Sequence, residues 1–120
     1  MGDNKDYITR PDEKGSINIS EEVVAAIAAA AAVETEGVAA LSSGKDFAEL
    51  LGKKNLTRGV KITVNEETIK VDLWLTVKLG VSVSKVGQQV QEAVAANIES
   101  MTGLAVTEVN VHVCGVSLEK

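Results

Sequence analysis

Cysteine, proline and histidine each occur once in this sequence of 120 residues, and its aromatic residues are one Trp, one Tyr and one Phe. A single cysteine, Cys114, cannot form an intramolecular disulfide, and no second Cys or His lies near it in the spacing of a metal site. A chain without disulfides is typical of a reducing compartment, so we expect a cytoplasmic protein. Its 45% hydrophobic and 24% charged residues are the mixture of an ordinary globular protein.

Long hydrophobic segments are also absent. The longest apolar run extends from Val23 to Val33, well short of the roughly 20 residues that cross a bilayer. The chain does not open with a basic segment followed by an apolar one, as a secretory signal would. We therefore expect a soluble protein with no direct insertion into a membrane.

Positive charge is scarce, since 12 Lys and Arg residues stand against 17 Asp and Glu residues and the net charge is −5. Affinity for nucleic acid depends largely on neutralising phosphates, so this balance disfavours a nucleic-acid partner. One basic loop keeps an RNA-binding module open as an alternative, although Gly52 in that loop lacks the second glycine of a Gly-x-x-Gly clamp. The basic residues of this loop are Lys53, Lys54 and Arg58.

The residue types that catalysis needs are equally sparse. His112 and Cys114 stand two positions apart and would share one side of a strand, but no third residue that could orient them follows from the sequence. Plain alternation along a strand gives the same spacing, so two exposed residues are the simpler interpretation. Glu66 and Glu67 fall in a turn, where carboxylates are usually solvated, and no phosphate-binding glycine loop occurs. We predict no enzyme activity, no cofactor and no metal.

The first 15 residues are mostly polar or charged, which predicts a flexible tail at 1–15 followed by one domain at 16–118. That domain should begin with a helix from Ser20 to about Glu36. Ser20 is a good N-cap, and Gly37 is of the type that usually terminates a helix.

The middle of this helix consists almost entirely of alanine, so it has hardly any polar face. The outer side, with Ala28, Ala29 and Ala32, is either covered by other parts of the protein or is a contact surface. Ala28 and Ala32 are therefore candidate interaction residues. The residues expected to face the core are Val23, Val24, Ile27, Ala30 and Ala31.

The clearest pattern in the chain is an alternation of apolar and polar residues from Val60 to Val64 and again from Ile69 to Leu79. It predicts an antiparallel hairpin with one buried face, preceded by a short strand at 38–41 and an amphipathic turn at 45–51. The alternation puts Trp74 on the face opposite the aliphatic core. Either the segment from Ser42 to Arg58 covers the ring, or the ring is an exposed anchor for a partner.

A second helix is expected from the N-cap candidate Ser84 to Gly103, and a last strand from about Ala105 to Gly115. Alternation on the strands predicts helices on one side only. The fold class is therefore α+β, a two-layer sandwich with a mostly antiparallel sheet of about four strands and two main helices on one face. The expected core residues are Val86, Val90, Val94, Ile98 and Met101 on the helix, and Val109, Val111 and Val113 on the strand.

Several short blocks of sequence are typical of one protein family when they occur together. The most specific are Met-Thr-Gly-Leu at 101–104 and Val-Asn-Val-His-Val at 109–113. With the blocks at 59–62, 71–73, 80–81 and 90–92, they resemble the alkaline shock protein family, the envelope stress response family of Gram-positive bacteria. The likeness extends over about residues 16–118. It implies a non-enzymatic cytoplasmic protein, held near the membrane in some members by a separate anchor protein, and it transfers no catalytic residue.

These observations together predict a stress-response protein that acts as a binding or scaffold module in cell-envelope homeostasis. Its expected partners are proteins, either a second copy of the chain or a membrane-anchored protein. The interaction residues would be Trp74, Ala28 and Ala32, whereas the RNA-binding alternative would use Lys53, Lys54 and Arg58.

Overall fold

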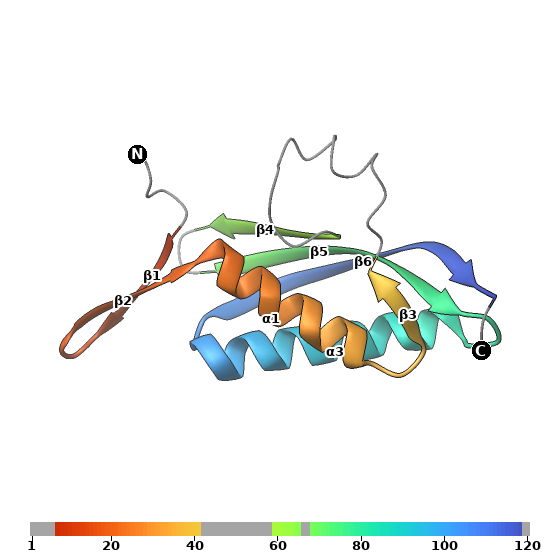
Figure 1. The fold of residues 1–120 in the computed structure, drawn as a ribbon. Coiled ribbons are helices and arrows are strands. Elements are labelled where there is room, and N and C mark those ends of the chain that lie inside the picture. The colour runs from red at the N-terminus through yellow and green to blue at the C-terminus, as the bar shows by residue number, and fades with distance from the viewer. Residues whose placement is uncertain (1–6, 42–58, 66–67, 119–120) are drawn as a thin grey trace.

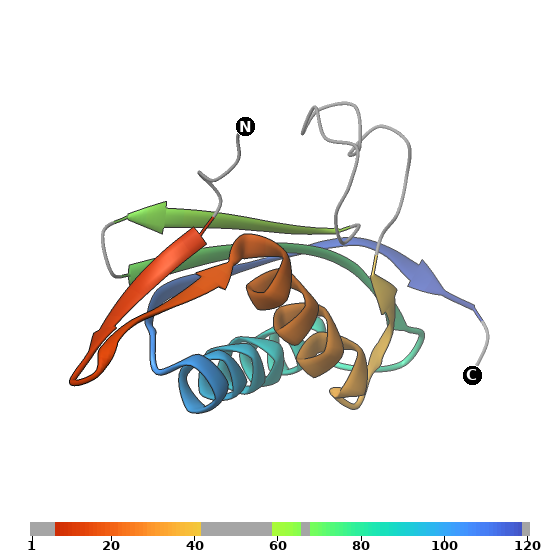
Figure 2. The same cartoon turned by 60° about the vertical axis from the view of Figure 1, so that its left-hand side comes forward.

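The computed structural model describes residues 7–41, 59–65 and 68–118. Two helices, α1 (Glu21–Glu34) and α3 (Val83–Thr102), lie side by side on one face of a four-stranded sheet, and a separate two-stranded hairpin extends from one end (Figure 1). The second view shows the same two layers (Figure 2). This confirms the predicted α+β sandwich. The strands are β1 (Tyr7–Asp12), β2 (Gly15–Ser20), β3 (Val38–Leu41), β4 (Val60–Asn65), β5 (Thr68–Lys78) and β6 (Ala105–Ser117).

Strand β5 is the centre of the sheet. β4 pairs antiparallel with β5 from Thr68 to Leu73 and β3 pairs antiparallel with it from Leu75 to Val77, so these short strands share one edge. β6 pairs along the other edge from Thr68 to Lys78, in the parallel direction. The parallel pairing follows from α3, which carries the chain back along the sheet before β6 begins. The predicted hairpin and the short strand at 38–41 are both confirmed.

The core lies between the inner face of β5 and the two helices. The inner residues of β5 are buried, as the alternation predicted, and Trp74 points to the other face with Lys70, Asp72 and Thr76. Helix α3 contributes one buried side chain in each turn at a spacing of four residues. The buried residues of these two elements are Ile69, Val71, Leu73, Leu75 and Val77 on β5, and Val86, Val90, Val94, Ile98 and Thr102 on α3.

Helix α1 begins where the sequence predicted but turns a different side to the core. The Ser20 hydroxyl accepts a hydrogen bond from the Val23 amide at 3.2 Å, which confirms the N-cap. The predicted outer side is wrong, however, because Ala28 and Ala32 are both 0% exposed whereas Val23 is 49% exposed. Ala30, expected inside, is also exposed. With alanine on every side, side-chain size cannot distinguish the faces, and packing against α3 and the sheet decides the orientation.

Helix α3 differs from the prediction at its first and last turns. Its N-cap is Ser82 rather than Ser84, and the Ser82 hydroxyl accepts from the Lys85 amide at 3.4 Å. Both serines could cap a helix, and the chain reverses early enough, at Gly80 with φ of 97°, for the first of them to do so. Met101 is 67% exposed, because the spacing of four from Ile98 continues to Thr102 and not to Met101.

The predicted flexible tail does not extend to Gly15, because β1 and β2 pair over their whole length from Tyr7↔Ser20 to Asp12↔Gly15. Ile8 is only 1% exposed and belongs to the hydrophobic core. A two-stranded hairpin needs apolar residues on one face alone, so its composition remains mostly polar and resembles that of a tail. The predicted amphipathic turn at 45–51 lies outside the described residues.

We predict that Ile8→Ala lowers the free energy of unfolding by about 2 to 5 kcal/mol, because it removes a fully buried side chain. Urea denaturation of both proteins would measure the difference. Ile17→Ala is the matched control, since Ile17 is 44% exposed on the paired strand and its truncation should have little effect. Equal effects of the two substitutions would contradict a docked hairpin.

We also predict that Ala28→Glu destabilises the protein by about 3 to 5 kcal/mol, because it places an unpaired charge in the core. Ala30→Glu on the exposed side of α1 should be nearly neutral, since glutamate is a good helix former. Thermal unfolding followed by circular dichroism distinguishes the two. A harmless Ala28→Glu would mean that α1 turns a different side to the core, with Ala28 at the surface.

Candidate functional site

The face of the sheet opposite the helices carries a row of interacting side chains from β5 and β6. The parallel register places Trp74 directly beside His112. Their rings stack with centroids 4.9 Å apart and an interplanar angle of 15°. Stacked aromatic rings of this kind attract each other beyond the effect of burial alone.

Polar contacts continue this row along the two strands. His112 Nε2 lies 3.4 Å from Asp72 Oδ1, and Asn110 Nδ2 donates to the same oxygen at 3.2 Å. Asn110 Nδ2 also donates to Glu108 Oε2 at 2.9 Å, and Lys70 Nζ lies 3.9 Å from that oxygen. We refer to the whole set as the outer-face cluster. Its members are Lys70, Asp72, Trp74, Glu108, Asn110 and His112.

The outer-face cluster combines one large aromatic ring with polar groups that are already held by neighbours. Side chains fixed in this way lose little conformational freedom when a partner binds, which favours recognition. The side chain of His112 is 45% exposed and that of Glu108 is 51% exposed, so a partner could reach both. The arrangement is suited to binding a protein surface.

The structure does not join the thiol of Cys114 to the imidazole of His112. Cys114 Sγ donates to the backbone carbonyl oxygen of His112 at 3.7 Å, while the imidazole contacts Trp74 and Asp72. A nucleophile and its base need a direct hydrogen bond between their side chains. The geometry therefore gives no support to a Cys-His catalytic pair.

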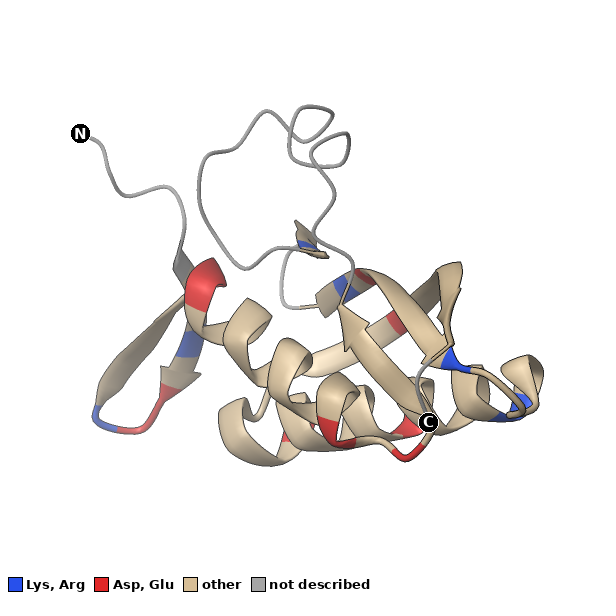
Figure 3. Ribbon diagram, turned by 45° about the vertical axis from the view of Figure 1, so that its right-hand side comes forward, with Lys and Arg blue, Asp and Glu red and all other residues tan. Residues whose placement is uncertain are grey.

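The remaining predicted interaction residues have different outcomes. Ala28 and Ala32 lie in the core and offer no surface to a partner. Lys53, Lys54 and Arg58 lie outside the described residues, as does the whole segment expected to cover Trp74, so RNA binding and that cover stay predictions. The charged residues of α1 stand near its two ends, and the side exposed between them is apolar (Figure 3). This exposed side consists of Val23, Ala26, Ala30 and Val33. An apolar outer side was expected from the alanine-rich sequence, but Val23 and Ala30 were expected to face the core.

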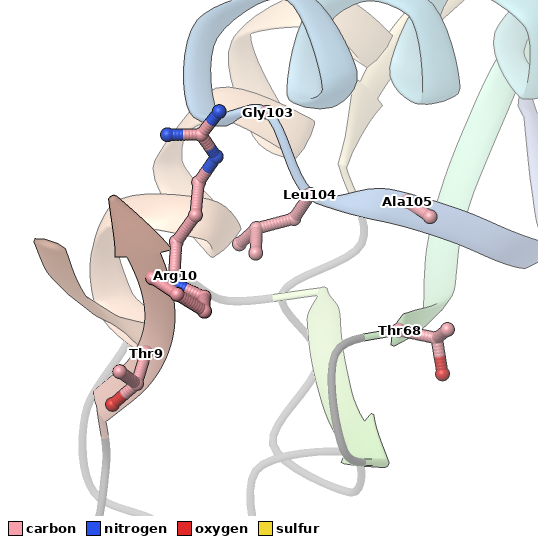
Figure 4. Close-up of a pocket in the computed structure, with 7 residues that line it drawn as sticks. Thr9, Arg10, Thr68, Gly103, Leu104 and Ala105 are labelled. Carbon is pink, nitrogen blue, oxygen red and sulfur yellow. The ribbon is translucent and has the colours of Figure 1, made fainter. Parts of the chain in front are cut away.

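A pocket of about 340 Å³ opens where the β1–β2 hairpin meets the end of α3 (Figure 4). Arg10 reaches from β1 to Gly103, where an added Cβ atom would stand 2.5 Å from Arg10 Nε. Gly103 also has φ of 80°, so both the backbone and this contact favour glycine. The last turn of α3 has no basic residue, and Arg10 supplies a positive charge at this negative end of the helix dipole. The contact of Arg10 with Gly103 therefore holds the hairpin against the end of α3. The sequence did not predict this contact, because Arg10 falls in the segment expected to be a flexible tail.

Within residues 7–41, 59–65 and 68–118, no three His, Cys, Asp or Glu side chains gather closely enough to hold a metal ion. Neither of the helices described above is long and apolar enough to cross a membrane.

Comparison with known proteins agrees with the resemblance found in the sequence. The model of the alkaline shock protein 23 family, described as having a cell envelope-related function, matches residues 9–118. The uncharacterized proteins YqhY and YloU of Bacillus subtilis are 35% and 37% identical to the chain, and the matches cover 88% and 85% of it and 79% and 88% of those relatives. Among solved structures, a nickel form of MamM CTD gives a TM-score of 0.50 at 16% identity, over 78% of this chain and 96% of that one. At this identity the structural likeness shows the fold alone.

We predict that Trp74 and His112 stabilise each other by about 0.5 to 1.5 kcal/mol, the usual range for a stacked aromatic pair. A double-mutant cycle with Trp74→Ala, His112→Ala and the combined variant would measure this coupling by urea denaturation. The control cycle pairs Trp74→Ala with Lys85→Ala on α3, in the helical layer. Those two changes should add to within about 0.5 kcal/mol. Simple additivity in the first cycle would contradict the stacking contact.

Proposed function

Because this chain belongs to the alkaline shock protein family, whose function is related to the cell envelope, we propose that it is a non-enzymatic scaffold that binds another protein through its outer-face cluster. The single observation that carries the proposal is the stack of Trp74 on His112, on the face of the sheet opposite α1 and α3. Tryptophan is among the residues that contribute most to binding energy at protein interfaces.

The polar part of the cluster adds specificity to this anchor. Asp72, Asn110 and Glu108 are joined by hydrogen bonds along β5 and β6, so a partner would meet donors and acceptors at fixed positions. A polar rim beside an aromatic anchor is the usual composition of a protein interface. Cys114 and His112 lack the direct bond between thiol and imidazole that a Cys-His mechanism would need.

A membrane-anchored protein is the partner class that fits a cytoplasmic protein acting at the envelope. The chain carries a net charge of −5, and the cytoplasmic leaflet of a membrane is itself negative. Direct adsorption to lipid is therefore opposed by electrostatics. Attachment through an anchored protein would hold the chain beside the membrane without this repulsion, and stress-dependent expression would then change how much scaffold the envelope receives.

The experiment follows a fluorescently tagged full chain in a Gram-positive host that carries the anchored partners. The wild-type protein should concentrate at the cell periphery, and the combined variant Trp74→Ala with His112→Ala should disperse into the cytoplasm. The control variant, Gln88→Ala with Gln89→Ala, alters exposed residues of α3 in the helical layer and should behave as the wild type. Circular dichroism of each purified protein must show a folded chain. Peripheral localisation of a folded Trp74 and His112 variant would refute the proposal.

A further inference from the structure

One edge of strand β6, called its free edge below, has no neighbouring strand in the part of the chain that the structure describes. The strand pairs with β5 along its other edge from Ala105 to Ser117. A strand edge of this length presents a row of backbone donors and acceptors that can pair with another strand. Proteins usually protect such edges when they are meant to stay unpaired.

Helix α3 protects only the first part of this edge. Glu99 Oε2 accepts from the Val106 amide at 3.0 Å, and Gln91 Nε2 donates to the Val109 carbonyl oxygen at 3.0 Å. Successive residues of a strand direct their backbone groups to alternate edges, so Val111 and Val113 present theirs on the same side as Val109. Among the described residues, no side chain is bonded to the backbone of Val111 or Val113 in the same way.

The later part of the edge also lacks the residue types that prevent pairing. The sequence from Val109 to Leu118 contains no Lys, Arg, Asp, Glu or Pro. The apolar side chains of β6 become more exposed toward the end of the strand. The bulge at 113–115 lies outside the segment 108–112, so it does not interrupt that segment. Leu79 lies at the same end, joined by its amide to the Ser117 carbonyl oxygen at 3.0 Å. The exposed apolar residues here are Leu79, Val83, Val113, Val116 and Leu118.

The segment at 108–112, Glu-Val-Asn-Val-His, is complementary to itself when read in the antiparallel direction. With a two-fold axis at Asn110, Glu108 of one copy stands opposite His112 of the other, valine opposite valine, and Asn110 opposite Asn110. Directly opposed side chains of an antiparallel pair attract when their charges differ and repel when they match. No like charges meet in this register.

We propose that the free edge of β6 pairs antiparallel with the same edge of a second copy, about a two-fold axis at Asn110. The inference rests on the proposed scaffold function and deepens it by naming a second copy as one partner. Pairing joins the two four-stranded sheets into one continuous sheet with both outer-face clusters on the same side. The Val109 carbonyl oxygen keeps its bond from Gln91 and accepts a second one, because a carbonyl has two lone pairs.

Disulfide trapping tests the position of the axis. The variant Asn110→Cys with Cys114→Ser brings two thiols face to face in the proposed dimer, so mild oxidation should convert most of the full chain into a covalent dimer. The control, Ser100→Cys with Cys114→Ser, has its thiol at an exposed position of α3 and should form much less dimer at the same concentration. Equal trapping of the two variants would overturn the proposal.

Charge reversal tests the register independently. His112→Glu places two like-charged pairs across the axis and should weaken the dimer roughly tenfold in sedimentation equilibrium. Adding Glu108→Lys places opposite charges across the axis and should recover most of the affinity. Thermal unfolding shows whether each variant is folded, which matters because His112 also contacts Asp72. A folded His112→Glu variant that associates as tightly as the wild type would overturn the register.

The outcome for the wild-type chain separates this inference from the proposed function. A chain that stays monomeric up to about 1 mM overturns β6 pairing, because a dissociation constant above that value corresponds to no more than about 4 kcal/mol of binding. Peripheral localisation that depends on Trp74 would then still support the scaffold function. The opposite result is a trapped dimer together with peripheral localisation that does not depend on Trp74. It would support β6 pairing and refute docking through the outer-face cluster.

Discussion

Five buried aliphatic side chains on β5 hold the two layers of this protein together. The strand is hydrogen-bonded along both edges, to β3 and β4 on one side and to β6 on the other, so its backbone has little freedom to shift. Both helices pack over its inner face. The opposite face is held equally firmly, because Asp72 and Trp74 alternate along the same strand with the buried Leu73 and Leu75. The position of the outer-face cluster is therefore fixed by the same side chains that form the core.

The parts of the fold that could be predicted are those with a clear period. Alternation identified β4 and β5, and a spacing of four identified the core face of α3 up to Ile98. The predicted buried side of α1 was wrong, because alanine on every side of the helix removes the contrast between apolar and polar faces that identifies a buried side. The prediction was also wrong for the hairpin at 7–20, because one buried residue such as Ile8 does not change the composition of a polar segment.

The candidate site shows the same division between local and long-range information. The side of the sheet that Trp74 occupies follows from its neighbours in sequence, and this was predicted correctly. Its contact with His112, 38 positions later, depends on the parallel register of β5 and β6. That register is set by the length of α3 and by two bulges, and no local pattern in the sequence reports it. The contact between Arg10 and Gly103 is a similar case, since it joins the first described strand to the end of the last helix.

The parallel pairing of β5 with β6 also affects the order in which the protein folds. β6 follows every other described element in the sequence, and its contacts with β5 span the whole of α3. Contacts between such distant segments form slowly, because the intervening chain must be ordered first. During synthesis, one edge of the most hydrophobic strand therefore stays open after the rest of the sheet has left the ribosome. Exposed strand edges of this kind are where nascent chains aggregate, and β6 protects this edge only after α3 has formed from its local contacts.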